Sequence, residues 1–237
     1  MNGPPTGRGI RIAVVDSGVH ASHPHVGRVA GGVGIDAHGV ECPDYVDRLG
    51  HGTAVAAAIH EKAPDADLLA VKVFDRSLST SVTALVSAIG WCVRAGVHLV
   101  NLSLGTPRAS HEQALREAVA GAASHGVVIV SARKDDQPES ALWFPGSLAG
   151  VVGVEVDWTI DRDRCRIVDG EQGATVFASG FPRPIPGVAP QQNLHGVSFA
   201  VANVTGLLAS AIPPGASRLP LDDLLSALRD RARADAP

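Results

Sequence analysis

Short runs of consecutive apolar residues alternate along the chain with segments in which apolar residues recur at every third or fourth position. A short continuous run is typical of a strand buried on both faces, and the three- to four-residue spacing is typical of a helix. We therefore predict strands at residues 10–16, 68–74, 97–103, 126–132 and 150–156. We predict helices at residues 51–61, 81–95, 110–125, 196–212 and 219–234.

The alternation of strands and helices predicts an α/β fold of three layers, in which a mostly parallel twisted sheet carries helices on both faces. Because no repeat or linker interrupts the pattern, residues 1–237 are predicted to form a single domain. The helix at 196–212 is apolar on almost every side, so it should be buried, whereas the last helix should be an amphipathic surface helix. The glycine-rich segment 31–39 does not stand between a strand and a helix, so we predict a surface turn there rather than a phosphate loop.

Composition and charge exclude several classes of partner. The net charge is −4 and no basic run is present, which argues against binding to nucleic acid. No apolar segment reaches about 18 residues, so no membrane-spanning helix and no membrane partner are predicted. The three cysteines are widely spaced, and the first residues lack the apolar core of a signal peptide. We therefore expect a cytoplasmic location, without room for a folded propeptide before the first strand.

Three residue types that acyl transfer requires stand at the ends of predicted elements. Asp16 ends the first strand, His51 opens a helix and Ser198 opens the apolar helix. A serine hydroxyl is a weak nucleophile unless an imidazole accepts its proton, and a carboxylate fixes the tautomer of that imidazole. Each residue alone has an ordinary explanation, as a helix cap, a solvated histidine or a turn residue. Only the combination of the three, at one rim of the sheet, indicates catalysis.

Four segments carry these candidates: VVDSGVHASHP contains Asp16, HGTAVAA begins at His51, NLSLG contains Ser103 and GVSFAVANVTG contains Ser198. Their sequences and the chain order Asp, His, Ser resemble the subtilisin-like serine proteases (peptidase family S8) over about residues 10–208. The resemblance implies that Asp16 orients His51, that His51 is the general base and acid, and that Ser198 attacks the scissile carbonyl. It implies a serine endopeptidase that acts on a peptide or protein substrate.

The same resemblance implies a groove that binds an extended peptide as an added strand. Residues 103–105 would form one wall of the S1 pocket, and residues 78–80 the opposite edge strand of the groove. Residues 131–133 would form the second S1 wall, with residues 144–146 at the far end. An Arg133 side chain that points into the pocket favours an acidic P1 residue, whereas one that points outward does not affect specificity. The substrate-binding residues implied are Leu78, Ser79, Thr80, Ser103, Leu104, Gly105, Ser131, Ala132, Arg133 and Gly146.

One departure from the family pattern falls in the oxyanion hole. The family has an asparagine whose amide, together with the backbone N–H of the nucleophile, here Ser198, binds the oxyanion; Asp135 stands in place of that asparagine. An ionised carboxylate cannot donate a hydrogen bond, and the loss of one donor lowers turnover by about 10²–10³. Three alternatives stay open: Asp135 is protonated in the complex, Arg133 or Lys134 supplies positive charge, or the site is attenuated. We favour an active enzyme because the triad is intact.

No metal site and no cofactor are predicted. His20, His23 and His25 lie close together after the first strand, but no fourth ligand is apparent. Segment 60–73 is too short to contain the strong calcium-binding loop that the family carries there, and it offers no carboxylate-rich substitute. We therefore expect no high-affinity structural calcium at this place.

The expected function is that of an intracellular processing protease, for example one that cleaves a leader from a precursor peptide. Biosynthetic partner proteins are a candidate class of partner. One alternative is an attenuated or inactive subtilisin-like module that binds an extended peptide, which Asp135 favours and the intact triad opposes. A second alternative, a nucleotide-binding α/β protein, is opposed by the lack of a phosphate loop.

Overall fold

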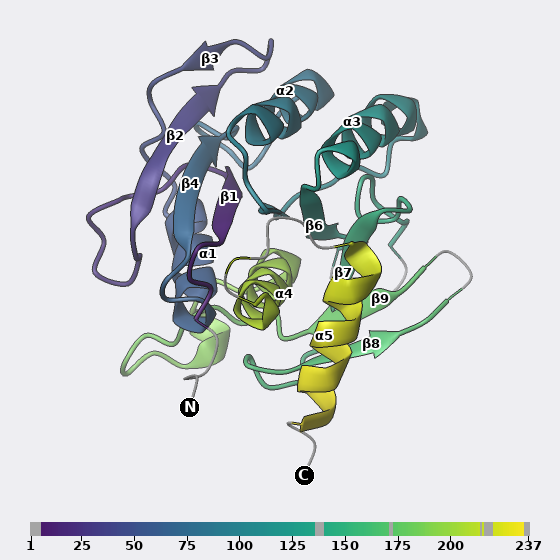
Figure 1. Ribbon diagram of the computed structural model, residues 1–237. Helices are drawn as coiled ribbons and strands as arrows, with labels where there is room; N and C mark the ends of the chain where they lie inside the picture. The colour runs from purple at the N-terminus through teal and green to yellow at the C-terminus, as the bar shows by residue number, and fades with distance from the viewer. Residues whose placement is uncertain (1–5, 136–139, 171–172, 214, 216–219, 235–237) are drawn as a thin grey trace.

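The middle layer of the protein is a sheet whose central strands are those that the apolar runs predict. The structure, a computed structural model, describes residues 6–135, 140–170, 173–213, 215 and 220–234 (Figure 1). Nine strands are found in these ranges: β1 (Arg11–Asp16), β2 (Val29–Ile35), β3 (Glu41–Cys42), β4 (Asp67–Lys72), β5 (Leu99–Leu102), β6 (Val128–Ala132), β7 (Val151–Val156), β8 (Cys165–Val168) and β9 (Thr175–Ala178). They pair in the order β3-β2-β4-β1-β5-β6-β7-β9-β8. The pairings from β2 to β9 are parallel, and the outer strands β3 and β8 pair antiparallel.

Helices cover both faces of this sheet. The described residues contain α1 (His51–Lys62), α2 (Val82–Arg94), α3 (Glu112–Ser124), α4 (Val197–Ala211) and α5 (Leu221–Ala234), with short 3-10 turns η1 (Ala109–His111) and η2 (Pro190–Gln192). Helices α1, α4 and α5 pack on one face, and α2 and α3 lie together on the other (Figure 1). Helix α4 is buried along nearly its whole length, as its apolar sequence predicts. None of the helices in the described part of the chain is long and apolar enough to cross a membrane.

The continuous apolar runs follow directly from this three-layer arrangement. In β1, Ile12 and Val14 belong to the core on the α1 and α4 side, whereas Ala13 and Val15 belong to the core on the α2 and α3 side. Because successive strand residues point to opposite faces, a strand covered on both sides must be apolar at every position. The predicted three-layer α/β fold is confirmed. That all 237 residues form one domain stays a prediction, because both chain ends lie outside the described ranges.

The segment at residues 31–39 is a surface turn only at its end, where residues 37 and 38 form an exposed turn, so the expectation is wrong for residues 31–35. These residues belong to β2, which pairs in parallel with β4. A Cβ atom on Gly32 would lie 2.4 Å from the Ala70 carbonyl oxygen, and one on Gly34 would lie 2.3 Å from the Asp44 carbonyl oxygen. Glycine is therefore required by close backbone approach. A strand built from glycines has no apolar run by which to recognise it.

The parallel strands bring the predicted chemistry to one rim of the sheet. Asp16 ends β1, Ser103 follows β5, and Asp135 follows β6, and these three strands are neighbours in the sheet. Residue 136, which follows Asp135 and continues the charged sequence Arg133-Lys134-Asp135, lies outside the described residues. Helices α1 and α4 pack against each other, and each presents its first residues to this rim.

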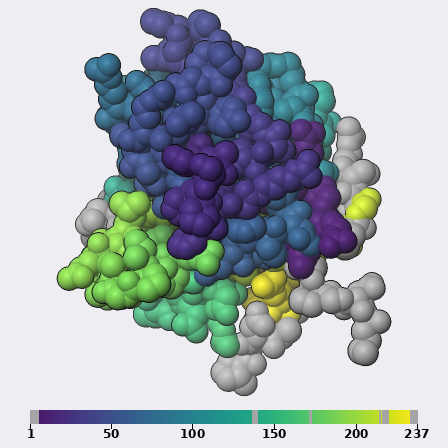
Figure 2. Space-filling view, turned by 90° about the vertical axis from the view of Figure 1, so that its left-hand side faces the viewer, coloured from purple at the N-terminus to yellow at the C-terminus, as the bar shows by residue number. Residues whose placement is uncertain are grey.

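The loop between β9 and α4 fixes where α4 begins. It forms the light green projection in Figure 2, beside the purple and blue N-terminal part of the chain. Its two ends are joined, because the Gly196 N–H donates to the Gly180 carbonyl oxygen at 2.9 Å. The buried Asn203 side chain of α4 donates to the carbonyl oxygens of Ser179 and Phe181 at 2.9 and 3.1 Å. The N-cap and the middle of α4 are therefore both tied to residues 179–181, the segment that follows β9.

Candidate active site

Asp16 and His51 come from two different elements and meet at the rim. Asp16 is fully buried at the end of β1, and His51 is the first residue of α1. His51 Nδ1 lies 2.7 Å from Asp16 Oδ1, which also accepts the Ser17 N–H at 2.7 Å. A carboxylate only accepts hydrogen bonds, so His51 Nδ1 carries the proton and Nε2 is free to accept one. The structure thus brings the two predicted residues together in the orientation that a general base needs.

The surroundings of His51 adjust its basicity in opposite directions. Burial lowers the pKa of His51, but the hydrogen bond that His51 donates to Asp16, the charge of Asp16 and the charge of Asp47 together outweigh burial. The net pKa of His51 therefore lies above its ordinary value of 6.5. A raised pKa strengthens His51 as a proton acceptor and stabilises the imidazolium that forms when it has taken a proton.

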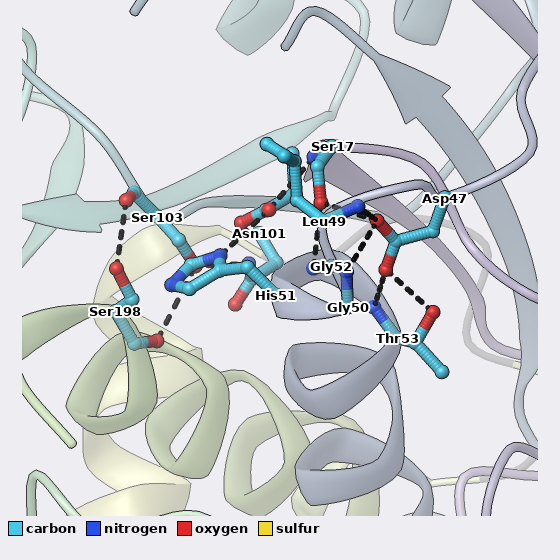
Figure 3. A network of polar contacts seen from close by, with 11 residues as sticks. Ser17, Asp47, Leu49, Gly50, His51, Gly52, Thr53, Asn101, Ser103 and Ser198 are labelled. Atoms are coloured by element: carbon cyan, nitrogen blue, oxygen red, sulfur yellow. Dashed lines mark hydrogen bonds and ion pairs between the residues drawn. The ribbon is translucent and has the colours of Figure 1, made fainter. Parts of the chain in front are cut away.

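Asp47, which was not among the predicted site residues, organises the start of α1 (Figure 3). Its Oδ1 accepts the Ser17 hydroxyl and the N–H groups of Leu49 and Gly50, each at 2.9 Å. Its Oδ2 accepts the N–H and the hydroxyl of Thr53 at 2.9 and 2.6 Å. The carboxylate therefore caps the helix that carries His51. An acidic residue just before a predicted helix start is the signal that could have identified it.

Replacing Asp47 should destabilise the protein in a pH-dependent manner. Burial raises the pKa of Asp47, but hydrogen bonds from Thr53, Leu49 and Ser17 outweigh it and hold the pKa below 3.8. A carboxylate with a depressed folded pKa stabilises the native state above its unfolded pKa, and this contribution is lost as pH falls through the folded pKa. We expect Asp47→Asn to lower the free energy of unfolding by about 2 kcal/mol at neutral pH, because buried donors lose a charged acceptor.

Urea denaturation at neutral pH and at about pH 3 measures this effect. The destabilisation by Asp47→Asn should shrink at the lower pH, where the wild-type carboxylate is losing its charge. The matched control is Asp163→Asn, an exposed substitution that should be nearly neutral at both values. An Asp47→Asn effect that is absent, or of equal size at both pH values, would contradict this role.

Ser198 is held against the segment that follows β5. Its hydroxyl donates to the Ser103 carbonyl oxygen at 3.1 Å, and the Ser103 hydroxyl donates to the Ser198 carbonyl oxygen at 3.3 Å. In Figure 3 the Ser198 hydroxyl points toward Ser103, and the Phe199 ring lies 5.6 Å from the His51 ring. Because the Ser198 hydroxyl now donates to Ser103, transfer of its proton to His51 requires the O–H bond to turn.

A buried chain of polar groups fixes the position of Ser103. Asn101 Nδ2 donates to the Ser103 hydroxyl at 2.7 Å, and the Thr205 hydroxyl lies 3.0 Å from Asn101 Oδ1 and 2.8 Å from the Val201 carbonyl oxygen. Asn101 and Thr205 are both fully buried. These hydrogen bonds connect the middle of α4, through Asn101 of β5, to Ser103, the residue that contacts Ser198. Sequence reasoning missed both residues, although a polar residue inside an apolar strand or helix is a usable signal.

The predicted oxyanion hole lies where β6 ends and α4 begins. Asp135 is half-buried, and its Oδ1 accepts the Ser140 hydroxyl. The Ser198 N–H belongs to the first turn of α4, where backbone donors have no acceptor within the helix. The roles of Asp135 and of the Ser198 backbone stay predictions.

Glu155 of β7 pairs with both Arg133 and Lys134, the two basic residues that follow β6. Arg133 Nε lies 3.5 Å from Glu155 Oε1, and Lys134 Nζ lies 3.1 Å from Glu155 Oε2. The side chains of Arg133 and Glu155 are each only 13% exposed. Arg133 also lines a cavity of about 650 Å³ that includes Arg116 and Leu225. Arg133 is therefore engaged by Glu155, and its effect on the P1 residue stays a prediction.

The two predicted walls of the S1 pocket are connected to each other. The Ser131 hydroxyl donates to the Leu104 carbonyl oxygen at 3.2 Å. A Cβ atom on Gly146 would lie 2.0 Å from the Ala132 carbonyl oxygen, so the far end packs tightly against the second wall. Residues 78–80 do not form the expected edge strand: they are irregular in the structure, in the connection between β4 and α2.

Comparison with known proteins identifies the family. The subtilase family matches residues 7–162 of this chain. The thermostable alkaline protease of Halalkalibacterium halodurans is 33% identical over 220 residues, which cover 86% of this chain and 56% of that protein. The chain spans about half the length of such curated relatives.

Solved structures show the same fold. Sphericase has a TM-score of 0.70 and 25% identity, and the match covers 96% of this chain and 84% of that one. The prenylagaramide maturation protease PagA has a TM-score of 0.62 and 26% identity, over 96% of this chain and 78% of that one. The fold is therefore subtilisin-like, and the chain belongs to the subtilase family.

Proposed function

We propose that this protein is a serine endopeptidase in which Asp16, His51 and Ser198 form the catalytic triad. The observation that carries the proposal is the 2.7 Å contact between Asp16 Oδ1 and His51 Nδ1, together with the 5.6 Å separation between the His51 ring and the ring of Phe199, the residue after Ser198. Membership of the subtilase family and the likeness to an alkaline protease support it.

The reaction follows from what each side chain can donate or accept. The Ser198 hydroxyl turns from Ser103 toward His51 Nε2, gives up its proton and attacks the peptide carbonyl carbon. Asp16 stabilises the imidazolium that results, and the imidazolium then protonates the leaving amine. A water molecule, deprotonated by His51, hydrolyses the acyl-enzyme and regenerates Ser198. No cofactor takes part in this scheme.

An extended substrate would lie between residues 103–105 and residues 78–80. Backbone groups of residues 103–105, which follow β5, would pair with the substrate backbone. The exposed Leu78, with 55% of its surface accessible, and its two successors would contact the other side of the substrate. Binding would thus add a strand to the sheet beside the triad.

Asp135 is proposed to act in its protonated form. The alternative in which Arg133 or Lys134 supplies the positive charge is disfavoured, because both side chains are engaged by Glu155. The Ser140 hydroxyl donates to Asp135 Oδ1 and so holds the carboxyl group in place. A protonated carboxyl donates one hydrogen bond, as the family asparagine does.

Replacing Asp135 with asparagine should therefore change the pH dependence of cleavage. Wild-type kcat is expected to rise with pH as His51 loses its proton and then to fall at alkaline pH, where the carboxyl group can no longer donate, whereas Asp135→Asn should keep its activity and exceed the wild type by about 10²–10³ at the alkaline end. Peptide cleavage followed across pH measures the difference. The control Asp135→Ala lacks a hydrogen-bond donor at this position, so its kcat should stay low at every pH. A wild-type profile governed by His51 alone, with no gain from asparagine, would rule out a protonated Asp135.

We further propose a processing role inside the cell, in which the enzyme cleaves a precursor peptide together with biosynthetic partner proteins. The likeness to a maturation protease supports this role. Neither the exposed Cys42 nor the buried Cys92 is part of a disulfide, which agrees with a reducing compartment. Cleavage at one defined site of a precursor, rather than at many sites of unfolded proteins, is the result expected of a processing enzyme.

The rival function, a peptide-binding module without turnover, is favoured by the carboxylate of Asp135 alone. Incubating the protein with a mixture of synthetic peptides and analysing the products by mass spectrometry distinguishes the two. The proposal predicts internal cleavage that a fluorophosphonate abolishes. Saturable peptide binding without any cleavage, by a protein shown to be folded, would support the module.

A further inference from the structure

The slot between the two predicted S1 walls is occupied by a side chain of the protein itself. Gly105 of the first wall faces Trp143: a Cβ atom added to Gly105 would lie 3.0 Å from Trp143 Cβ and 3.1 Å from Trp143 Cε3. The Trp143 N–H donates to the Arg133 carbonyl oxygen of the second wall at 2.6 Å. Trp143 thus has its backbone on one wall and its side chain against the other.

The surroundings of Trp143 hold it in this slot. The next residue, Phe144, exchanges two backbone hydrogen bonds with Thr106, each of 2.9 Å. The Trp143 side chain is half-buried and packs against the core cluster that contains Ala132 and Val197. Val197, the residue before Ser198, belongs to the same cluster.

We propose that Trp143 determines the P1 specificity of this protease by filling the depth of the S1 slot, so that only small P1 side chains fit. This inference rests on the proposed function. Glycine and alanine at P1 would lie above the indole, whereas leucine or phenylalanine would have to displace it and expose its apolar surface. One misfit methylene alters selectivity by about 10–200-fold, so phenylalanine at P1 should lower kcat/KM at least about 100-fold relative to alanine.

The test uses fluorogenic peptides that differ only at P1, with glycine, alanine, leucine or phenylalanine, and reads kcat/KM for each. The wild type should prefer alanine, and Trp143→Ala should reduce the alanine-to-phenylalanine ratio at least about tenfold through a gain on phenylalanine. A milder variant, Trp143→Leu, should give an intermediate ratio and serves where the alanine variant does not fold. The control is Trp158→Ala, which removes a tryptophan that is 41% exposed and should keep the wild-type ratio.

Two outcomes separate this inference from the proposed function. A wild type that cleaves phenylalanine and alanine substrates equally well, or variants that leave the ratio unchanged, would overturn the role of Trp143 while leaving the protease intact. A folded wild type that neither cleaves nor reacts with a fluorophosphonate would overturn the proposed function. In that case the P1 preference is read from peptide dissociation constants for the wild type and Trp143→Leu, and equal affinities for the alanine and phenylalanine peptides would overturn the inference as well.

Discussion

Asp16→Asn is expected to lower kcat about 10⁴-fold while the protein stays folded. In the structure, Asp16 Oδ1 accepts the proton on His51 Nδ1, which leaves Nε2 as the acceptor. An asparagine amide can instead donate to Nδ1. The ring then carries its proton on Nε2, where it can no longer receive the proton of Ser198.

The same variant should also shift the pH dependence of what activity remains. Asp16 raises the pKa of His51 through its hydrogen bond and its charge. Because His51 must be neutral to act as a base, the activity of the wild type should rise with pH through a value above 6.5. Without the carboxylate, burial dominates the pKa of His51 and lowers it, so the rise in activity should move to lower pH. Measurements of kcat/KM across pH test both the loss in rate and the shift of the pH profile, with Asp163→Asn as the control. If Asp16→Asn kept the wild-type rate and pH profile, Asp16 would be excluded from the triad.

Ser198→Ala is expected to have the largest effect, a loss of about 10⁶-fold in kcat. The alanine has no nucleophile, so neither His51 nor the oxyanion donors have a reaction to assist. Peptide affinity should change little, because residues 103–105 bind through their backbone. Loss of the hydrogen bond to Ser103 should leave the thermal unfolding midpoint within a few degrees of the wild type, as estimated from a bond of about 1 kcal/mol.

Cleavage and peptide binding are measured in parallel for this variant, and Ser22→Ala, which changes an exposed serine, serves as the control. Full binding with no cleavage is the predicted pattern. Substantial cleavage by purified Ser198→Ala would mean that another residue is the nucleophile.

The sequence predicts the centre of the sheet well and its edges poorly, for a physical reason. Strands such as β6, buried on both faces between α3 and α4, leave a continuous apolar run that contrasts with its neighbours. Strand β2 is not predicted, because close backbone approach requires glycine at Gly32 and Gly34 and interrupts any apolar run. Strand β8 is an outer strand whose Arg166 and Val168 are exposed, so no apolar run marks it.

In the candidate site, too, some residues can be predicted from the sequence and others cannot. The triad positions stand in short local segments, so Asp16, His51 and Ser198 could be proposed without any structure. Thr205 contacts Asn101 across 104 positions of the chain, and such a contact has no local signature. The position of Trp143 between two walls is likewise a property of three separate segments that only folding brings together.

Reaction with a fluorophosphonate measures most directly whether Ser198 is a nucleophile activated by His51. After digestion and mass spectrometry, the wild type should carry one adduct, located on Ser198. Labelling should be absent from Ser198→Ala and much slower in Asp16→Asn. A folded wild type that stays unlabelled across its whole range of stable pH, or an adduct that persists in Ser198→Ala, would contradict the assignment of a serine protease.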